Sequence, residues 1–385
     1  MREIKIRIAR DEEYSIYIEK GILTDLDEYV SKIIKSKRVI VITNPLVNSL
    51  YGAKLLSALK RGKFSTDFIE VPDGEKYKCL STANYLYNEL LKRKADRSTG
   101  LMALGGGVIG DLTGFVAATY MRGLPLVHIP TTLLAQIDSS IGGKVAVDHS
   151  LAKNIVGSFY QPKAVFVDPE VLFTLSDKDL KNGIVEAIKI AVIKSPVFFK
   201  WLGSNICQLL NKDIDILCEL IKKSVSFKVD VVLEDPWETG LRKILNFGHS
   251  IGHALEVGAG YQNLSHGEAV ALGMLVETKI ARNRGICSEE FEEQIKNVLS
   301  LLSPSLSSPP SFGSFPQKRE SIFKYIKNID YNQFWETLTL DKKNYQGRMA
   351  FILPEALGKV SLVDNITKEE TIKALKEFKK EGELW

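Results

Sequence analysis

Short apolar strands that alternate with helical segments place the strongest constraint on how this chain can fold. Residues 38–43 (RVIVIT) form a nearly continuous apolar run, as expected for a strand buried on both faces. A helical pattern follows, then a strand near 67–71, a helix over 80–92 and another strand over 100–104. Strands that alternate with helices predict a mostly parallel α/β sheet in the N-terminal half.

Other patterns extend this reading toward both ends of the chain. The first twenty residues alternate apolar and polar positions, which predicts a hairpin through residues 10–13, and residues 165–168 (VFVD) read as a further strand. After about residue 175 helical periodicity takes over, and the expected helices cover residues 180–192, 214–232, 244–256, 268–283, 289–301 and 368–380. We also expect a Ser/Pro-rich exposed loop at 303–316 and a short hairpin within 338–353.

Length and composition bound the class of protein. A chain of 385 residues suggests about two domains, and 45% hydrophobic with 25% charged residues is typical of a globular protein. A net charge of +4 is too small to indicate nucleic-acid binding. No apolar run suits a signal peptide or a membrane span, and the four cysteines form no CxxC pair. We therefore expect no nucleic-acid or membrane partner, reduced thiols and a cytoplasmic location.

A glycine-rich turn follows the strand over 100–104. Gly105, Gly107 and Gly110 form GxGxxG at the start of a predicted helix, a pattern that lets the backbone approach a pyrophosphate. The usual fingerprint follows the first strand and has an acidic residue about twenty positions on, which this chain lacks. Ordinary tight-turn glycines are the alternative. Because Asp111 would repel phosphate, we expect it to contact a sugar hydroxyl, a nicotinamide end or a substrate.

Polar and charged residues stand out in segment 122–154, which otherwise consists largely of apolar and small residues. Isolated charges among apolar neighbours are costly to bury unless they are paired or bind a ligand. The residues are Arg122, Thr131, Thr132, Asp138, Lys144, Lys153 and Asn154. A buried structural ion pair is the alternative explanation. Lys228 and Arg242 add cations later in the chain, and either could equally be a solvated helix charge.

Three of the five histidines lie within residues 249–266. His249 and His253 are four residues apart, which places both imidazoles on one helix face, and His266 follows after a loop. A catalytic zinc takes three protein ligands of the His, Asp or Glu type and keeps one open position. Glu186 stands in an apolar helical run, where either a metal ion or an ion pair with Lys189 would stabilise its carboxylate. The residues by themselves leave both explanations open.

Motifs over nearly the full chain are similar to those of the 3-dehydroquinate synthase family. They are PDGEKYK, GGGVIGD, MRG, PTTLLAQIDSSIGGK, AKNIVGSFYQPKAVFVD, EAIK, GLRKILNFGHSIGHALE and HGEAVALGM, in this order. The resemblance implies a Rossmann-like NAD-binding domain over residues 1–177 and a mainly α-helical metal- and substrate-binding domain over 178–385, with the active site between them. It also implies a homodimer, NAD and a divalent metal, zinc or cobalt.

The resemblance also assigns roles to single residues. The implied metal ligands are Glu186, His249 and His266. The implied NAD contacts are Asn44, Glu75, Lys78, Gly106, Gly107, Asp111, Thr131 and Thr132, with Lys144 and Lys153 beside them. The implied catalytic and substrate-binding residues are Arg122, Asp138, Lys144, Asn154, Lys189, Lys228, Arg242, Asn246, His253 and Lys342. The chain departs from the family pattern at Ala152, usually Gly, and at 303–316; which of Lys342 and Lys343 faces the site stays open.

The implied reaction is the second step of the shikimate pathway toward chorismate and the aromatic amino acids. It converts a small anionic sugar phosphate, 3-deoxy-D-arabino-heptulosonate 7-phosphate, into 3-dehydroquinate and phosphate, with NAD regenerated. The alternatives are another sugar-phosphate cyclase (making 2-deoxy-scyllo-inosose or a valiolone), a net dehydrogenase that releases NADH, and an inactive binding protein. Lys228, Arg242, Asn246 and His253 together favour the dehydroquinate enzyme, and the intact ligand set argues against an inactive protein.

Overall fold

The computed structural model of the chain describes residues 1–9, 12–149, 152–258, 264–302, 329–341 and 349–382. These residues pack as two compact units. The first unit comprises Met1–Leu180 and Lys212–Trp237, and the second comprises Lys181–Asn211 and Glu238–Trp385. Helix α6 (Asp177–Lys194) passes from the first unit into the second.

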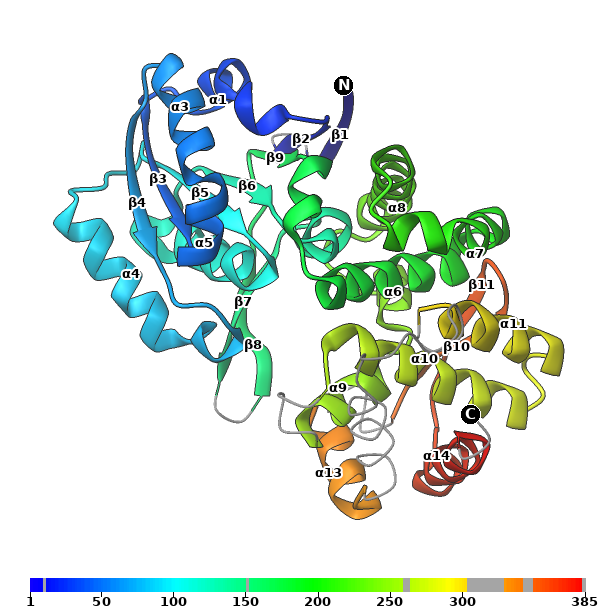
Figure 1. The fold of residues 1–385 in the computed structure, drawn as a ribbon. Helices are drawn as coiled ribbons and strands as arrows, with labels where there is room; N and C mark the ends of the chain where they lie inside the picture. The colour runs from blue at the N-terminus through cyan, green and yellow to red at the C-terminus, as the bar shows by residue number, and fades with distance from the viewer. Residues whose placement is uncertain (10–11, 150–151, 259–263, 303–328, 342–348, 383–385) are drawn as a thin grey trace, which may run out of the picture. The chain divides into compact units, whose positions relative to one another are not determined.

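A seven-stranded sheet organises the first unit, in the order β1-β2-β9-β6-β5-β3-β4 (Figure 1). Its strands are β1 (Arg2–Ala9), β2 (Glu12–Ile18), β3 (Arg38–Thr43), β4 (Ser65–Glu70), β5 (Gly100–Gly105), β6 (Leu126–Pro130) and β9 (Ala164–Val167). All neighbours are parallel except β1 and β2, which form the predicted N-terminal hairpin. The prediction of a mostly parallel α/β sheet is confirmed.

Helices cover both faces of this sheet. They are α1 (Asp27–Ile33), α2 (Pro45–Val47), α3 (Ala53–Arg61), α4 (Leu80–Lys92), α5 (Gly107–Thr119) and α8 (Ile214–Glu234). On β3, Ile40 and Ile42 pack with residues of α4 and α5, whereas Val39 and Val41 pack with residues of α1 and α3. Because successive side chains of a strand point to opposite faces, burial on both sides explains the continuous apolar run at 38–43.

A separate two-stranded antiparallel hairpin, β7 (Lys144–His149) and β8 (Ala152–Phe159), also belongs to the first unit. The polar residues of this segment hid its strands, and none was predicted there. Val145 and Val147 of β7 are buried, whereas Lys144 and His149 are exposed. Buried and exposed positions therefore alternate as in a half-buried strand, although the charged side chains make this alternation hard to recognise in the sequence.

Helix α8 lies in the first unit, whereas the predicted boundary grouped residues 178–385 together. It packs against β1 and against the helical turns Ala135–Ser139 and Pro169–Thr174. Its buried side chains include Leu220, Ile221 and Val225. An apolar helix face can pack on any apolar surface, so periodicity predicts the helix and not the unit it joins.

The second unit is mainly helical, as predicted. Its helices besides α6 are α7 (Pro196–Leu210), α9 (His249–Gly258), α10 (His266–Asn283), α11 (Glu289–Ser300), α13 (Tyr331–Asp341) and α14 (Lys368–Gly382). Among the helices of the described residues, none is long and apolar enough to cross a membrane. The stretch 303–316 and Lys342 lie outside the described residues.

The hairpin predicted within 338–353 is placed wrongly. The strands are β10 (Phe351–Ala356) and β11 (Lys359–Val363), and Gly358 with φ of 81° supplies the turn between them. Phe334 and Leu338 are both buried in α13, and their spacing of four residues is helical. The chain therefore stays helical to Asp341 before it reaches the hairpin.

Two glycines allow three helices of the second unit to approach closely. A Cβ atom on Gly273 of α10 would lie 1.9 Å from the carbonyl oxygen of Gly248, which directly precedes α9. A Cβ atom on Gly267, also in α10, would lie 2.5 Å from the Cα atom of Asn182 on α6. The backbones of α6, α9 and α10 can meet at these distances only because no side chain stands between them.

Replacing Gly273 with Ala should lower the free energy of unfolding by about 1–3 kcal/mol, because the methyl group must displace backbone atoms of the turn before α9. This effect outweighs the roughly 1 kcal/mol that Ala gains in helix propensity. Urea unfolding measures the change. Gly203→Ala in α7 is the matched control, because its nearest neighbour, Val298 Cγ2, lies 3.4 Å away and stability should hold or rise. Equal stability of both variants would contradict the close packing described here.

Candidate functional site

The predicted NAD contacts collect at one edge of the first unit's sheet. Strands β4, β3, β5 and β6 are parallel neighbours, so their carboxyl ends lie at the same edge. The residues that follow these strands are Asn44 after β3, Glu75 after β4, Gly106 and Gly107 after β5, and Thr131 and Thr132 after β6. Ligands of open α/β sheets bind outside the carboxyl ends of the strands, so this edge is the candidate cofactor site.

The glycine-rich turn between β5 and α5 is packed tightly against the end of β6. A Cβ atom on Gly105 would lie 2.7 Å from the Cβ atom of Ile109, and one on Gly106 would lie 3.0 Å from Thr132 Cγ2. Neither glycine has a positive φ, so the turn needs them for close approach and not for a left-handed backbone. Helix α5 begins at Gly107, and its N–H groups there can receive an anionic group.

A buried ion pair neutralises Asp111 at this edge. Lys78 is 4% exposed, and its Nζ atom donates a hydrogen bond to Asp111 Oδ2 at 2.8 Å. Glu75 Oε1 lies 3.8 Å from Lys78 Nζ and 3.7 Å from Lys153 Nζ. Burial opposes the charged form of Lys78, but the carboxylates of Asp111 and Glu75 outweigh it and raise the pKa of Lys78. The expected repulsion between Asp111 and a phosphate is therefore offset by Lys78.

Asp138 and Lys228 form an ion pair, the kind of interaction that was the alternative explanation for the charges in segment 122–154. Lys228 Nζ donates to Asp138 Oδ1 at 2.6 Å and to the Asp138 carbonyl oxygen at 2.5 Å. The Lys228 side chain is 7% exposed and that of Asp138 is 23% exposed. Lys228 is thus no solvated helix charge, and α8 brings it to the turn that carries Asp138.

Three further residues of the first unit lie exposed on loops or strands. Arg122 and Asn154 have left-handed backbones, with φ of 66° and 56°, and the Asn154 N–H donates to Asp148 Oδ1 at 2.8 Å. Such conformations cost about 1–3 kcal/mol outside glycine and are enriched at functional sites. Lys144 begins β7 and is exposed. Accessible polar groups of this kind can receive a ligand.

In the second unit, Glu186, His249 and His266 converge from three helices, α6, α9 and α10. Glu186 is fully buried, and its Oε1 atom lies 3.4 Å from Nε2 of each histidine. One candidate ligand atom from each residue lies within 4.8 Å of the others. Lys189 Nζ lies 2.5 Å from the other oxygen, Oε2. The ion pair with Lys189 is therefore present, and the second oxygen faces two imidazoles, an arrangement that could also hold a metal ion.

The surroundings of these residues fit a divalent metal ion. Nδ1 of His249 lies 3.2 Å from the carbonyl oxygen of Phe247, and Nδ1 of His266 lies 3.5 Å from Glu256 Oε1. Metal-ligating histidines bind in this manner, with one ring nitrogen on a protein acceptor and the other on the metal. Glu186 Oε1 is buried without a hydrogen bond among the described residues, which is costly unless a cation balances it. One carboxylate and two imidazoles can therefore hold an ion with an open position.

The charge states of Glu186 and His249 suit metal binding. Burial would raise the pKa of Glu186, but the charge of Lys189, with the neighbouring imidazoles, outweighs it and holds that pKa well below its usual value. Burial, with the neighbouring Lys189, lowers the pKa of His249 and keeps its ring neutral, the form that binds metals. Burial would lower the pKa of His266, but hydrogen bonds to Glu186 and Glu256 outweigh it and raise that pKa to about 10. A metal ion would therefore displace a proton from His266 when it binds.

The other predicted residues of the second unit are His253, Asn246, Arg242 and Lys342. The His253 ring centroid is 5.3 Å from that of His249, and Asn246 Nδ2 donates to Glu238 Oε1 at 3.3 Å. Arg242 is only 2% exposed, so it is not the solvated charge that remained possible. Lys342 lies outside the described residues.

Sequence reasoning missed Glu256, which follows His253 by three residues on α9. Glu256 is 5% exposed and can form a second candidate ligand group with His253 and His266. Like Glu186, it stands among apolar residues, here in the run HALEVG. A carboxylate in such a run was the available signal.

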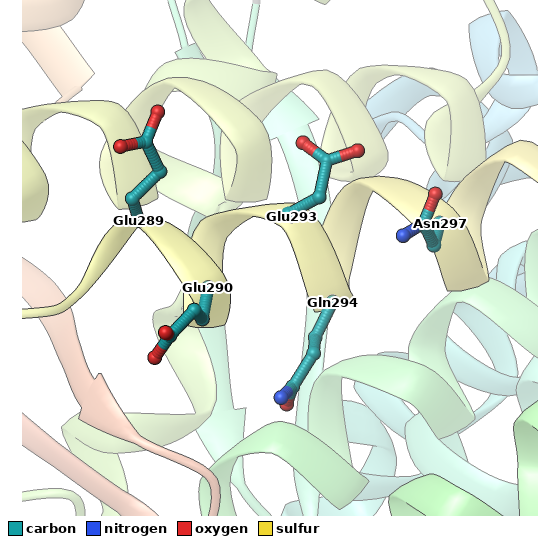
Figure 2. Close-up of a pocket in the computed structure, with 5 residues that line it drawn as sticks. All are labelled: Glu289, Glu290, Glu293, Gln294 and Asn297. Atoms are coloured by element: carbon teal, nitrogen blue, oxygen red, sulfur yellow. The ribbon is translucent and has the colours of Figure 1, made fainter.

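A hollow on helix α11 contains none of the predicted residues. Figure 2 shows the side chains that line it, Glu289, Glu290, Glu293, Gln294 and Asn297. All five come from one helix, and within the part of the chain that the structure describes no second element supplies a lining residue. This acidic surface is not part of the candidate site.

Comparisons with known proteins agree with these observations. Family models described as 3-dehydroquinate synthase N-terminal and C-terminal match residues 68–182 and 183–344. A 3-dehydroquinate synthase of Dictyoglomus turgidum is 42% identical over 378 residues, which cover 98% of each chain. That of Thermodesulfovibrio yellowstonii is 39% identical over 377 residues, or 98% of this chain and 100% of the relative.

A solved structure supports the same assignment at the level of the fold. The structure of 2-deoxy-scyllo-inosose synthase complexed with carbaglucose-6-phosphate, NAD+ and Co2+ has a TM-score of 0.82 and 26% identity. The match covers 98% of this chain and 100% of that chain. From the two family models and the full-length relatives, we conclude that the chain belongs to the 3-dehydroquinate synthase family.

Proposed function

We propose that this chain is a 3-dehydroquinate synthase, which converts 3-deoxy-D-arabino-heptulosonate 7-phosphate into 3-dehydroquinate and phosphate. The observation that carries the proposal is the convergence of Glu186, His249 and His266 with Lys189 beside them. Relatives of about 40% identity with this name support it. NAD and a divalent metal, zinc or cobalt, are the proposed cofactors, and the homologous cyclase that was solved with NAD+ and Co2+ supports both.

Glu186, His249 and His266 would hold the metal ion. A bound ion of this kind polarises a substrate hydroxyl group and lowers its pKa. The ammonium group of Lys189, 2.5 Å from Glu186 Oε2, adds a fixed positive charge beside the ligand set. That charge would stabilise an oxygen on which negative charge develops during the reaction.

The carboxyl edge of the first unit's sheet would hold NAD. Gly106, Gly107 and the N-terminus of α5 offer a close approach for the pyrophosphate, and the Lys78–Asp111 pair stands beside it. Bound NAD would take a hydride from the substrate and return it, so the reaction has no net change in oxidation state. Asn44, Glu75, Thr131, Thr132 and Lys153 complete the proposed contacts.

The substrate has a carboxylate and a phosphate, and the proposed contacts provide cations for both. They are Arg122, Lys144, Lys189, Lys228 and Arg242, with Asp138, Asn154, Asn246, His253 and Lys342 as further polar contacts. Charge-assisted hydrogen bonds from Arg and Lys to these anions are stronger than neutral ones. A simple dehydrogenase substrate would need fewer cations, which favours the cyclase over that alternative. We name no protein base, because the substrate phosphate is itself a candidate.

A homodimer and a cytoplasmic location complete the proposal. The dimer rests on the family resemblance of the sequence motifs, and the location rests on the composition of the chain and its cysteine pattern. Light scattering on the purified protein tests the dimer directly, and a mass equal to one chain would contradict it.

Removing a metal ligand should remove the ion and leave the fold. After equilibration with Zn2+ and dialysis, the wild-type protein should retain one ion per chain, and His266→Ala should retain none. Its circular dichroism should be unchanged, because the site is catalytic. His253→Ala is the matched control and should keep the ion, since His253 lies outside the proposed ligand set. Full zinc content in His266→Ala would show that the assignment is wrong.

A side chain in the glycine turn should weaken NAD binding. A Cβ atom on Gly107 would already lie 3.2 Å from Ser139 Oγ, and valine adds two methyl groups where the backbone must meet pyrophosphate. A steric penalty of about 1–3 kcal/mol corresponds to roughly a tenfold or larger loss of affinity. Isothermal titration with NAD measures it. Unchanged affinity in Gly107→Val would place the cofactor elsewhere.

Turnover should separate the cyclase from a dehydrogenase. We expect one phosphate released per substrate consumed, with NADH present only transiently and at enzyme-level amounts. Arg242→Ala should lower kcat/KM at least tenfold, because removing one partner of a buried charge interaction costs about 2–5 kcal/mol. Arg284→Ala, which loses contacts with Glu370 and Asn365 outside the proposed site, is the control and should keep wild-type kcat/KM. Steady NADH accumulation without phosphate would favour the dehydrogenase.

A further inference from the structure

A buried carboxylate stands behind the metal ligand His266. Glu256 of α9 is 5% exposed, and its Oε1 atom lies 3.5 Å from Nδ1 of His266. Nε2 of the same ring lies 3.4 Å from Glu186 Oε1. The His266 ring therefore has one nitrogen toward the ligand set and the other toward a carboxylate outside that set.

The acceptor on Nδ1 decides how the ring can bind. A neutral imidazole carries its proton on one nitrogen and binds a metal through the other, and hydrogen bonding selects between the two. An ionised carboxylate only accepts hydrogen bonds, so Glu256 favours a proton on Nδ1. The lone pair of Nε2 is then directed toward Glu186 and His249. A charged acceptor also raises the basicity of the ligand nitrogen.

The two histidine ligands differ in the acceptor that Nδ1 faces. Nδ1 of His249 faces a neutral acceptor, the Phe247 carbonyl oxygen, whereas Nδ1 of His266 faces a carboxylate. Glu268, the acidic residue nearest to His266 along α10, accepts hydrogen bonds from Ser265 N and Oγ at 2.8 and 2.7 Å in a capping box. The carboxylate at the His266 ring thus comes from α9, whose position against α10 depends on Gly273.

We propose that Glu256 is a positioning residue that fixes the tautomer and orientation of the metal ligand His266. The proposal rests on the metal site described above and adds a residue to which the family resemblance gave no role. Glu256 acts through His266 and does not itself contact the ion.

A competing arrangement exists in the same residues. His253, Glu256 and His266 each offer a ligand atom, and these atoms also lie within 4.8 Å of one another. If Glu256 were a direct ligand, the ion would need His253 and would not need His249. The two arrangements therefore make opposite predictions for His249→Ala.

Metal affinity is the readout that tests the role of Glu256. Dissociation constants for Co2+ and Zn2+ would be measured by competition with a chromophoric chelator, and the visible absorption of bound Co2+ would report on ligand geometry. The variants are Glu256→Gln, Glu256→Leu, His249→Ala and the control Glu292→Gln. Glu292 is similarly buried, at 2% exposed, and it pairs with Lys279, Lys296 and Arg282 at 2.8, 2.9 and 3.2 Å instead of a metal ligand.

We expect the variants to lose metal affinity to different degrees. Glu256→Leu should weaken metal binding roughly 10- to 100-fold and change the Co2+ spectrum, because a metal ligand that loses the acceptor on its second ring nitrogen binds the ion less tightly. Glu256→Gln keeps an oxygen acceptor without the charge, so its affinity should fall between wild type and Glu256→Leu. Glu292→Gln should lower the Tm and leave metal affinity unchanged, and His249→Ala should lose the ion.

Two results would overturn the proposal. One is a dissociation constant and a Co2+ spectrum in Glu256→Gln and Glu256→Leu that equal those of the wild type. If the leucine variant does not fold, the result for Glu256→Gln is decisive by itself. The other is retention of the ion by His249→Ala together with its loss from Glu256→Leu, which would make Glu256 a direct ligand. Failure of the wild-type protein to bind any ion would instead refute the proposed metal site itself.

Discussion

The fully buried carboxylate of Glu186 is the group on which the arrangement of the second unit depends. Burial of a charge costs several kcal/mol per ion unless other charges and hydrogen bonds compensate it. Lys189 on the same helix can supply only part of that compensation, at one oxygen. The other oxygen needs groups from elsewhere, and α9 and α10 deliver an imidazole each. The close contacts at Gly267 and Gly273 follow from this requirement, because bulkier residues would hold the helices too far apart.

In the first unit, buried cations are compensated by single carboxylates. Lys78 pairs with Asp111 and Lys228 pairs with Asp138, so each cation has a carboxylate within hydrogen-bonding distance. Both acids belong to turns or helices that follow strands of the sheet, where a ligand of a parallel sheet binds. Polar groups held in pairs keep a fixed geometry before any ligand arrives, and such preorganisation lowers the cost of binding.

The sequence predicted local elements of the fold better than contacts between distant segments. The helix at 80–92 and the strand at 38–43 match the structure, because their residue patterns are local. The candidate ligands Glu186, His249 and His266 could be named from residue type and resemblance, but their distances depend on three helices. The unit that α8 joins could not be predicted, since its apolar face suits either core. Glu256 was missed because its role depends on which ring nitrogen of His266 faces it, a property of orientation and not of spacing.

The charges around the candidate metal site indicate how its parts act together. Glu186 and Glu256 carry one negative charge each, Lys189 carries one positive charge, and the imidazoles that bind a metal are neutral. These groups sum to one net negative charge, so a bound dication would leave one net positive charge. Lys189 draws electron density from Glu186, whereas Glu256 raises the basicity of His266, so the two groups act on different ligands in opposite directions. The surplus charge that remains suits a substrate that is itself an anion and that gains negative charge on an oxygen during reaction.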